Sequence, residues 1–133
     1  MGQGRFVLDT HAFIWSLTSP ERLGARAAKL LKRIDAGDGQ ALVPAAALAE
    51  LCLLREAGRT PIGLAEARAA FDRSPNLWLL PLDVDQVETF AALGGVRDIF
   101  DRFIVAAAKS LGARLITRDG GIAESGLVAT VWD

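Results

Sequence analysis

Short apolar runs alternate with longer helix-compatible stretches along the whole chain. The short runs are bounded by breaks such as Gly37–Gly39 and Gly58–Pro61, which is typical of strands. They predict strands at Phe6–Leu8, Ala41–Val43, Leu77–Leu80, Arg114–Thr117 and Val128–Val131. The longer stretches predict helices at Ala12–Leu17, Glu21–Asp35, Pro44–Ala57, Leu64–Asp72, Asp83–Leu93 and Ile99–Leu111, with a short helical turn after Asp119.

This alternation predicts an α/β fold. Helices that separate successive strands are too long for hairpins, so the connections are right-handed crossovers between parallel strands. We therefore expect a three-layer α/β/α sandwich with a parallel sheet of about five strands. With 133 residues, no internal repeat and no linker, residues 1–133 are expected to form a single domain.

The chain is unusually apolar. Apolar residues make up 51% of it and the mean hydropathy is +0.28, so part of its apolar surface is expected to be covered by a partner. The early region has more large apolar groups than one short and one medium helix can bury against one sheet face. We therefore expect an exposed groove for an amphipathic partner helix among Phe13, Ile14, Trp15, Leu17, Leu23, Leu30 and Leu31.

Charge and cysteine content exclude several classes of protein. The formal net charge is −1, so nucleic-acid binding would require a local patch of arginines. Cys52 is the single cysteine, which excludes an intrachain disulfide, and with one histidine it cannot form a zinc cluster. We find no signal peptide and no apolar run near the ~20 residues of a membrane span, so a cytoplasmic protein is expected.

Four acidic residues stand where the surrounding pattern predicts burial. Asp9 and Asp119 each follow a predicted strand. Asp101 lies in the first turn of a predicted helix, and Glu50 lies amid alanine and leucine. All four can face the carboxyl end of the sheet. Buried carboxylates need a compensating charge, and a hard divalent cation such as Mg²⁺ is the simplest candidate.

Three of these positions also have a structural interpretation. Asp9 and Asp119 suit helix N-caps, and Asp98 with Asp101 resembles a capping box.

Glu50 has no capping role, because it lies in the middle of a helix. Its structural alternative is a buried ion pair with Arg55 or Arg102.

Several neighbours of the acids are candidate site residues. Arg102 and Arg118 lie beside acidic positions and are candidate nucleic-acid contacts, although each also suits ordinary solvated surface. His11 suits a substrate contact or surface position better than a general base. Thr10 and Thr117 could orient carboxylates or a water, or could simply close local turns.

A phosphatase is an alternative that the residues disfavour. A haloacid dehalogenase-type phosphatase would have a second aspartate two residues after Asp9, where this chain has His11. No dinucleotide-binding glycine motif follows the first strand, and neither a P-loop nor a nucleophile elbow is present.

The motifs together resemble one family. Val7–Trp15 resembles the opening of PIN-domain ribonucleases, in particular the VapC-type toxins of bacterial toxin–antitoxin pairs. Arg97–Ala108 resembles their central helix motif, Leu115–Asp119 their fourth motif and Leu127–Trp132 their closing strand. Ala47–Leu51 lies where that family has its helical glutamate.

Two positions depart from the pattern. Ile99 stands where the family usually has proline, and Ala49 stands where an aromatic residue more often precedes the acid.

The resemblance implies a metal-dependent endoribonuclease that uses Mg²⁺ or Mn²⁺. Transferred to this chain, the metal-binding and catalytic acids would be Asp9, Glu50, Asp101 and Asp119, with Asp98 as an auxiliary acid. The resemblance also implies a VapB-type antitoxin, whose tail blocks the acidic pocket, and a homodimer of the toxin. The alternative is a catalytically inactive PIN-like module that binds RNA or protein.

Overall fold

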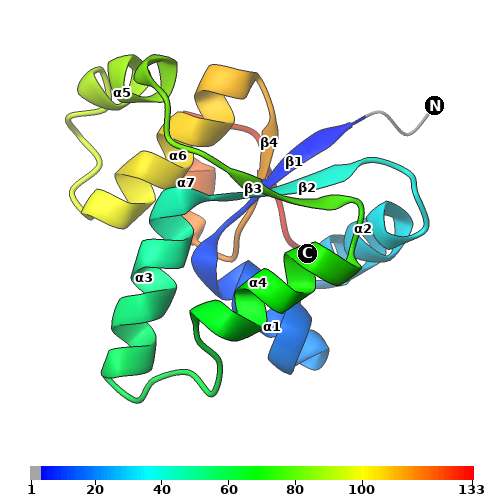
Figure 1. Cartoon of the computed structure of the whole chain (residues 1–133). Coiled ribbons are helices and arrows are strands. Elements are labelled where there is room, and N and C mark those ends of the chain that lie inside the picture. The colour runs from blue at the N-terminus through cyan, green and yellow to red at the C-terminus, as the bar shows by residue number, and fades with distance from the viewer. Residues whose placement is uncertain (1–3) are drawn as a thin grey trace.

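Strand β1 lies at the centre of the sheet, and the later strands extend from it on both sides (Figure 1). The structure, a computed structural model, describes residues 4–133. All strand pairs are parallel, in the order β3-β2-β1-β4-β5. The strands are β1 (Arg5–Leu8), β2 (Gln40–Pro44), β3 (Leu77–Leu80), β4 (Arg114–Ile116) and β5 (Thr130–Val131). The strand order reverses at β1 and β4, so a ligand crevice is expected at the carboxyl ends of these two strands.

Helices cover both faces of this sheet, which confirms the predicted three-layer α/β/α sandwich. In Figure 1, α1, α2 and α4 lie on one side of the strands, and α5 and α6 lie on the other. Helix α3 extends from the end of β2 and contacts α1, α4 and α6. The helices are α1 (Thr10–Thr18), α2 (Ala25–Asp35), α3 (Ala45–Glu56), α4 (Leu64–Arg73), α5 (Val84–Ala91), α6 (Ile99–Leu111) and α7 (Gly120–Ser125), with a 3-10 turn η1 (Pro20–Arg22).

Helix α6 contributes five consecutive buried residues, Ile104 to Ala108, to the core. It contacts the three central strands of the sheet. Asp98 caps its first turn, because Oδ1 accepts a 3.0 Å hydrogen bond from the Asp101 amide. The helix ends at Gly112, whose φ of 63° is left-handed and is adopted by glycine without strain.

The predicted elements are present, with one helix divided. The predicted helix over Glu21–Asp35 is η1 followed by α2, because Gly24 is extended and caps α2. A Cβ on Gly24 would overlap the carbonyl oxygen of Trp132, which also accepts a 3.0 Å hydrogen bond from the Ala27 amide. The chain end therefore packs against this break. Strand β5 is also shorter than predicted.

The prediction of an exposed groove in the early region is wrong. Phe13, Ile14 and Trp15 are buried, and the predicted leucines of this region are partly buried against the core. The reason is that α4 packs on the same side as α1, and Phe13 stacks on Phe71 with ring centroids 5.7 Å apart. Large apolar side chains are instead exposed around β3 and α5 and at the start of α6. They include Trp78, Leu79, Leu82, Val84, Val87 and Ile99.

Among residues 4–133, no helix has the length and apolar character needed to cross a bilayer.

A candidate metal centre at the carboxyl edge of the sheet

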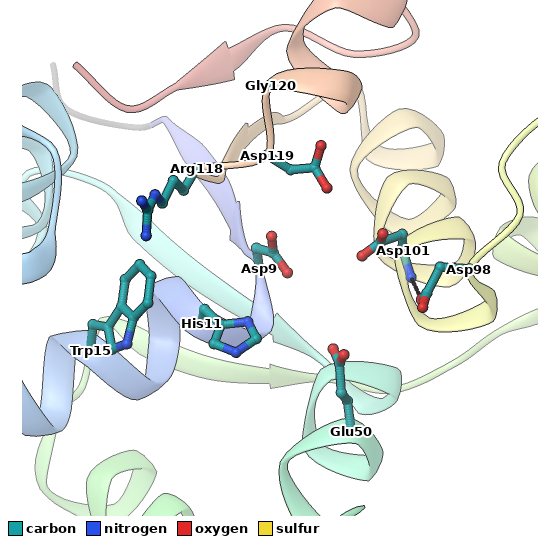
Figure 2. A pocket seen from close by; sticks show the side chains of 9 residues that line it. All are labelled: Asp9, His11, Trp15, Glu50, Asp98, Asp101, Arg118, Asp119 and Gly120. Carbon is teal, nitrogen blue, oxygen red and sulfur yellow. Dashed lines mark hydrogen bonds between the residues drawn. The ribbon is translucent and has the colours of Figure 1, made fainter. Parts of the chain in front are cut away.

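A cavity of about 560 Å³ opens at the carboxyl ends of β1 and β4 (Figure 2). All four acids singled out in the sequence line it, together with Asp98. They come from separate places in the chain, since Asp9 follows β1, Glu50 lies in α3 and Asp119 follows β4. The remaining lining residues are His11, Trp15, Arg118 and Gly120. The fold therefore brings the predicted acids together around one open space.

Three of the aspartates are held in place because their side chains cap the N-termini of helices. Asp9 accepts a 2.6 Å hydrogen bond from the Thr10 amide, and Asp119 accepts a 3.0 Å bond from the Ile122 amide. Each cap uses Oδ1, as does the cap made by Asp98. Among the described residues, no hydrogen bond uses Oδ2 of Asp98 or Asp119. The capping and ligand-binding interpretations are therefore compatible.

Two buried threonines hold carboxylates from other elements. The Thr10 hydroxyl donates to Glu50 Oε1 at 2.5 Å, and the Thr117 hydroxyl donates to Asp9 Oδ2 at 2.6 Å. Thr117 also accepts a 3.0 Å bond from the Asp119 amide, so it both closes the local turn and orients Asp9. Both threonine side chains are fully or almost fully buried.

The acids destabilise one another's charged forms. Burial, followed by repulsion from Asp9, Asp98, Asp119 and Glu50, raises the pKa of Asp101 from its ordinary 3.8 to about 7. Burial also raises the pKa of Asp9 and of Glu50, against the opposing hydrogen bonds from Thr117 and Thr10. A cation in the cavity would relieve this repulsion.

No cationic side chain of the described part of the chain forms an ion pair with these acids. Within residues 4–133, the single ion pair joins Arg33 to Asp38, at 2.6 Å on the surface. The proposed ion pair of Glu50 with Arg55 or Arg102 is absent. Arg55 donates to backbone carbonyls of the loop after α3, at Thr60 and Pro61.

The donor set fits a hydrated hard cation. Among the residues that the structure describes, no three His, Cys, Asp or Glu side chains converge closely enough to enclose a bare ion. Figure 2 shows Asp9, Asp101 and Asp119 facing one open space from different sides. Mg²⁺ commonly keeps several waters and binds through one or two carboxylates, which suits a wide oxygen-lined cavity.

The candidate RNA contacts divide into two groups. His11 and Arg118 line the cavity, whereas Arg102 does not. Arg102 donates a 2.9 Å hydrogen bond to the Phe90 carbonyl and lies 4.1 Å from the Phe90 ring centroid. Its guanidinium joins α6 to α5, so the structure gives it a packing role.

Trp15 and Gly120 also line the cavity, although neither is among the predicted site residues. The sequence does hold a signal for Trp15, which lies four residues after His11 and therefore shares its helix face. Their rings are 5.5 Å apart between centroids.

Comparison with known proteins gives a consistent result. The family model described as "PIN domain" matches residues 6–126. Among solved structures, the chain is similar to VapBC2 from Rickettsia felis bound to a promoter DNA fragment, with 14% identity over 97% of this chain and 99% of that one, at a TM-score of 0.71. It is similar to FitAcB from Neisseria gonorrhoeae, with 22% identity, coverage of 94% and 95%, and a TM-score of 0.64. It is also similar to VapBC-5 from Mycobacterium tuberculosis, with 25% identity, coverage of 96% and 98%, and a TM-score of 0.59. No curated protein matches the chain.

Proposed function

The chain belongs to the PIN-domain family, and we propose that it is a metal-dependent endoribonuclease of the VapC type, a toxin neutralised by a cognate antitoxin. The observation that best supports catalysis is the cavity in which five carboxylates meet without an ion pair to any cationic side chain of residues 4–133. The burial and mutual repulsion that raise the pKa of Asp101 to about 7 are typical of a functional site, whereas an inactive module would gain nothing from them.

Asp9, Glu50, Asp101 and Asp119 are the proposed metal-binding acids, and Asp98 is an auxiliary acid that acts through water. Mg²⁺ or Mn²⁺, when bound there, would activate a water for attack on the RNA phosphate and neutralise the developing charge. Thr10 and Thr117 hold Glu50 and Asp9 in fixed orientations through their hydroxyl groups.

His11 and Arg118 are the proposed substrate contacts within the cavity. Both line it and both lie near Trp15, and His11 also lies between Trp15 and the acids Asp9 and Glu50 (Figure 2). Arg118 would hold a phosphate oxygen of the substrate by a charge-assisted hydrogen bond. A cytoplasmic location is proposed with this activity, because the RNA substrate is available there.

A VapB-type antitoxin is the proposed protein partner. VapBC-5 from Mycobacterium tuberculosis is a member of a family of toxin–antitoxin systems, and a similar structure from Klebsiella pneumoniae is a toxin–antitoxin complex. We infer that the antitoxin tail closes the acidic cavity, so that co-expression yields a complex without ribonuclease activity.

A second copy of the chain is the proposed occupant of the exposed apolar surface. A cavity of about 310 Å³ lies there between α3 and α6, and no charged residue of the described part of the chain lines it. Its walls include Ala45, Ala46 and Ala49, while Leu82 and Ile99 are large and exposed at its rim. Small residues beside protruding ones give the self-complementary surface that a two-fold interface needs.

The test of catalysis is RNA cleavage by the purified chain in Mg²⁺, in Mn²⁺ and in EDTA. The substitutions Asp9→Asn and Asp101→Asn should each abolish cleavage while circular dichroism shows an unchanged fold. Asp72→Asn is the matched control, because Asp72 is exposed on α4 and lines none of these cavities.

Metal-independent cleavage, or full activity in both cavity variants, would contradict the proposal. Binding of RNA without cleavage in any metal would favour the inactive binding module. Hydrolysis of small phosphomonoesters in place of RNA would favour a phosphatase.

A further inference from the structure

A second, smaller hollow of about 240 Å³ adjoins the acidic cavity and shares two lining residues with it, His11 and Trp15. It lies between α1, η1 and the loop that follows α3. Its other walls are Ile14, Thr18, Ser19, Arg22, Leu54, Arg59, Thr60 and Pro61.

The two hollows differ in the acids that line them. Five carboxylates line the acidic cavity, whereas no carboxylate of residues 4–133 lines the second hollow. Its charged groups are the guanidinium groups of Arg22 and Arg59, both exposed to solvent. Neither forms an ion pair with any residue in the range 4–133. The second hollow is therefore an uncompensated positive site beside a negative one.

Trp15 lies at the junction of the two hollows, and two guanidinium groups contact its ring. Its side chain is buried at 7% exposure, so the ring is a fixed surface. The Arg22 guanidinium carbon lies 4.5 Å from the ring centroid, and that of Arg118 lies 5.7 Å from it. Contact with an aromatic face positions a guanidinium without neutralising its charge. Both groups therefore remain available to an anion.

We propose that this basic hollow, formed around Arg22, Arg59 and Trp15, binds an RNA backbone phosphate that neighbours the scissile phosphate on the same strand. The proposal rests on the proposed function, since it places the scissile phosphate among the acids of the first cavity. Arg118 lines that cavity and contacts the same tryptophan, so the cations continue from one hollow into the other.

The lining of the hollow suits one phosphate group, because it offers two guanidinium groups. Recognition through phosphates alone is independent of base sequence, so this hollow contributes affinity and register.

The test compares Arg22→Gln, Arg59→Gln and the double variant with wild type. Arg26→Gln is the matched control, because Arg26 is an exposed arginine on α2 outside both hollows. The probe is a fluorescent single-stranded RNA, with a second set in which single phosphates near the cleavage site are replaced by uncharged methylphosphonates. Binding is measured by anisotropy in Ca²⁺, and cleavage is measured separately in Mg²⁺.

The double variant should raise KM by roughly tenfold with kcat nearly unchanged, because the lost contacts bind substrate and transition state alike. The slope of log affinity against log salt should become shallower by about one for two lost cations at a single phosphate. One methylphosphonate position should weaken binding to wild type and have no further effect on the double variant.

Unchanged KM and salt slope in the double variant would overturn the subsite, even if wild type cleaves RNA. Failure of wild type to cleave, with binding that still depends on Arg22 and Arg59, would overturn the catalytic proposal and support the subsite. Loss of antitoxin binding with unchanged RNA binding would assign the hollow to an acidic peptide and overturn the proposal.

Discussion

The hydroxyl of Thr10 donates a 2.5 Å hydrogen bond to Oε1 of Glu50, a residue 40 positions later in the chain. Thr10 is fully buried and follows Asp9, while Glu50 lies in a different helix. The bond therefore fixes α3 against the start of α1 at the wall of the acidic cavity. It also stabilises the charged form of Glu50, against the burial that raises the pKa of this carboxyl.

Replacing Thr10 by valine should weaken metal binding, because the side chain keeps its shape but loses the donor that orients Glu50. Loss of a group that orients a metal ligand typically costs about 10–100-fold in metal affinity or activity. The measurement is RNA cleavage as a function of Mg²⁺ concentration, which should shift to higher concentrations in Thr10→Val.

Thr89→Val is the control for that experiment, since among the residues that the structure describes the Thr89 hydroxyl bonds only to the carbonyl of Asp85 in its own helix. An identical Mg²⁺ dependence in Thr10→Val and wild type would show that Glu50 needs no orienting hydroxyl.

The metal-free protein should lose stability as pH rises. Asp101 has a pKa of about 7 in the folded chain against an ordinary 3.8, so the folded state binds the proton more tightly than the unfolded state does. Its contribution is fully present below about pH 4 and is lost as pH rises through about 7. Asp9 and Glu50, whose pKa values are also raised, act in the same direction.

Thermal unfolding in EDTA between pH 4 and 8 measures this dependence. Asp101→Asn should flatten the decline in Tm across that window, while Asp72→Asn should retain it. Added Mg²⁺ should raise Tm most near pH 8, where the acids are charged. A wild-type Tm that rises with pH through this window, with the same rise in Asp101→Asn, would contradict the predicted repulsion.

The local pattern of apolar and polar residues predicts the positions of most elements. The acids are predicted as site residues because they interrupt that pattern. Asp9 and Asp119 each follow an apolar strand, and parallel strands bring such residues to one edge of the sheet. The threonine hydroxyls are harder to assign, since the bond from Thr117 to Asp9 spans 108 positions. From sequence spacing alone, Thr10 and Thr117 could either close local turns or orient carboxylates.

The failures have one common cause, which is packing between distant segments. The sequence predicts a groove among residues that include Phe13, because nothing near Phe13 in sequence reveals that Phe71 covers it. Gly24 divides the predicted helix because its backbone is extended, and Trp132, distant in sequence, occupies the space of a Cβ at this position. Arg102 lies beside an acid in sequence, yet its guanidinium is directed to Phe90.

Gly24→Ala should therefore destabilise the fold. The added methyl group would overlap the backbone of Trp132 and disturb the hydrogen bond that this carbonyl accepts from Ala27. Overpacking of this kind costs about 1–3 kcal/mol, measurable as a lower urea midpoint. Gly94→Ala is the control, since its Cβ would meet no atom within 4 Å. Equal midpoints for the two variants would place the chain end away from Gly24 in solution.

The exposed apolar surface gives a prediction about assembly. Leu82 and Ile99 are 49% and 56% exposed beside the alanine-lined cavity between α3 and α6. If a second copy covers this surface, the purified chain should sediment as a dimer at tens of micromolar, roughly the range where moderate interfaces associate. Leu82→Asp or Ile99→Asp would bury an unpaired charge at the interface and should yield a monomer with an unchanged fold. Leu64→Asp is the control, because Leu64 is 45% exposed at the start of α4, outside that cavity. A wild-type monomer at this concentration, or a dimer that survives both substitutions, would show that another partner covers the surface.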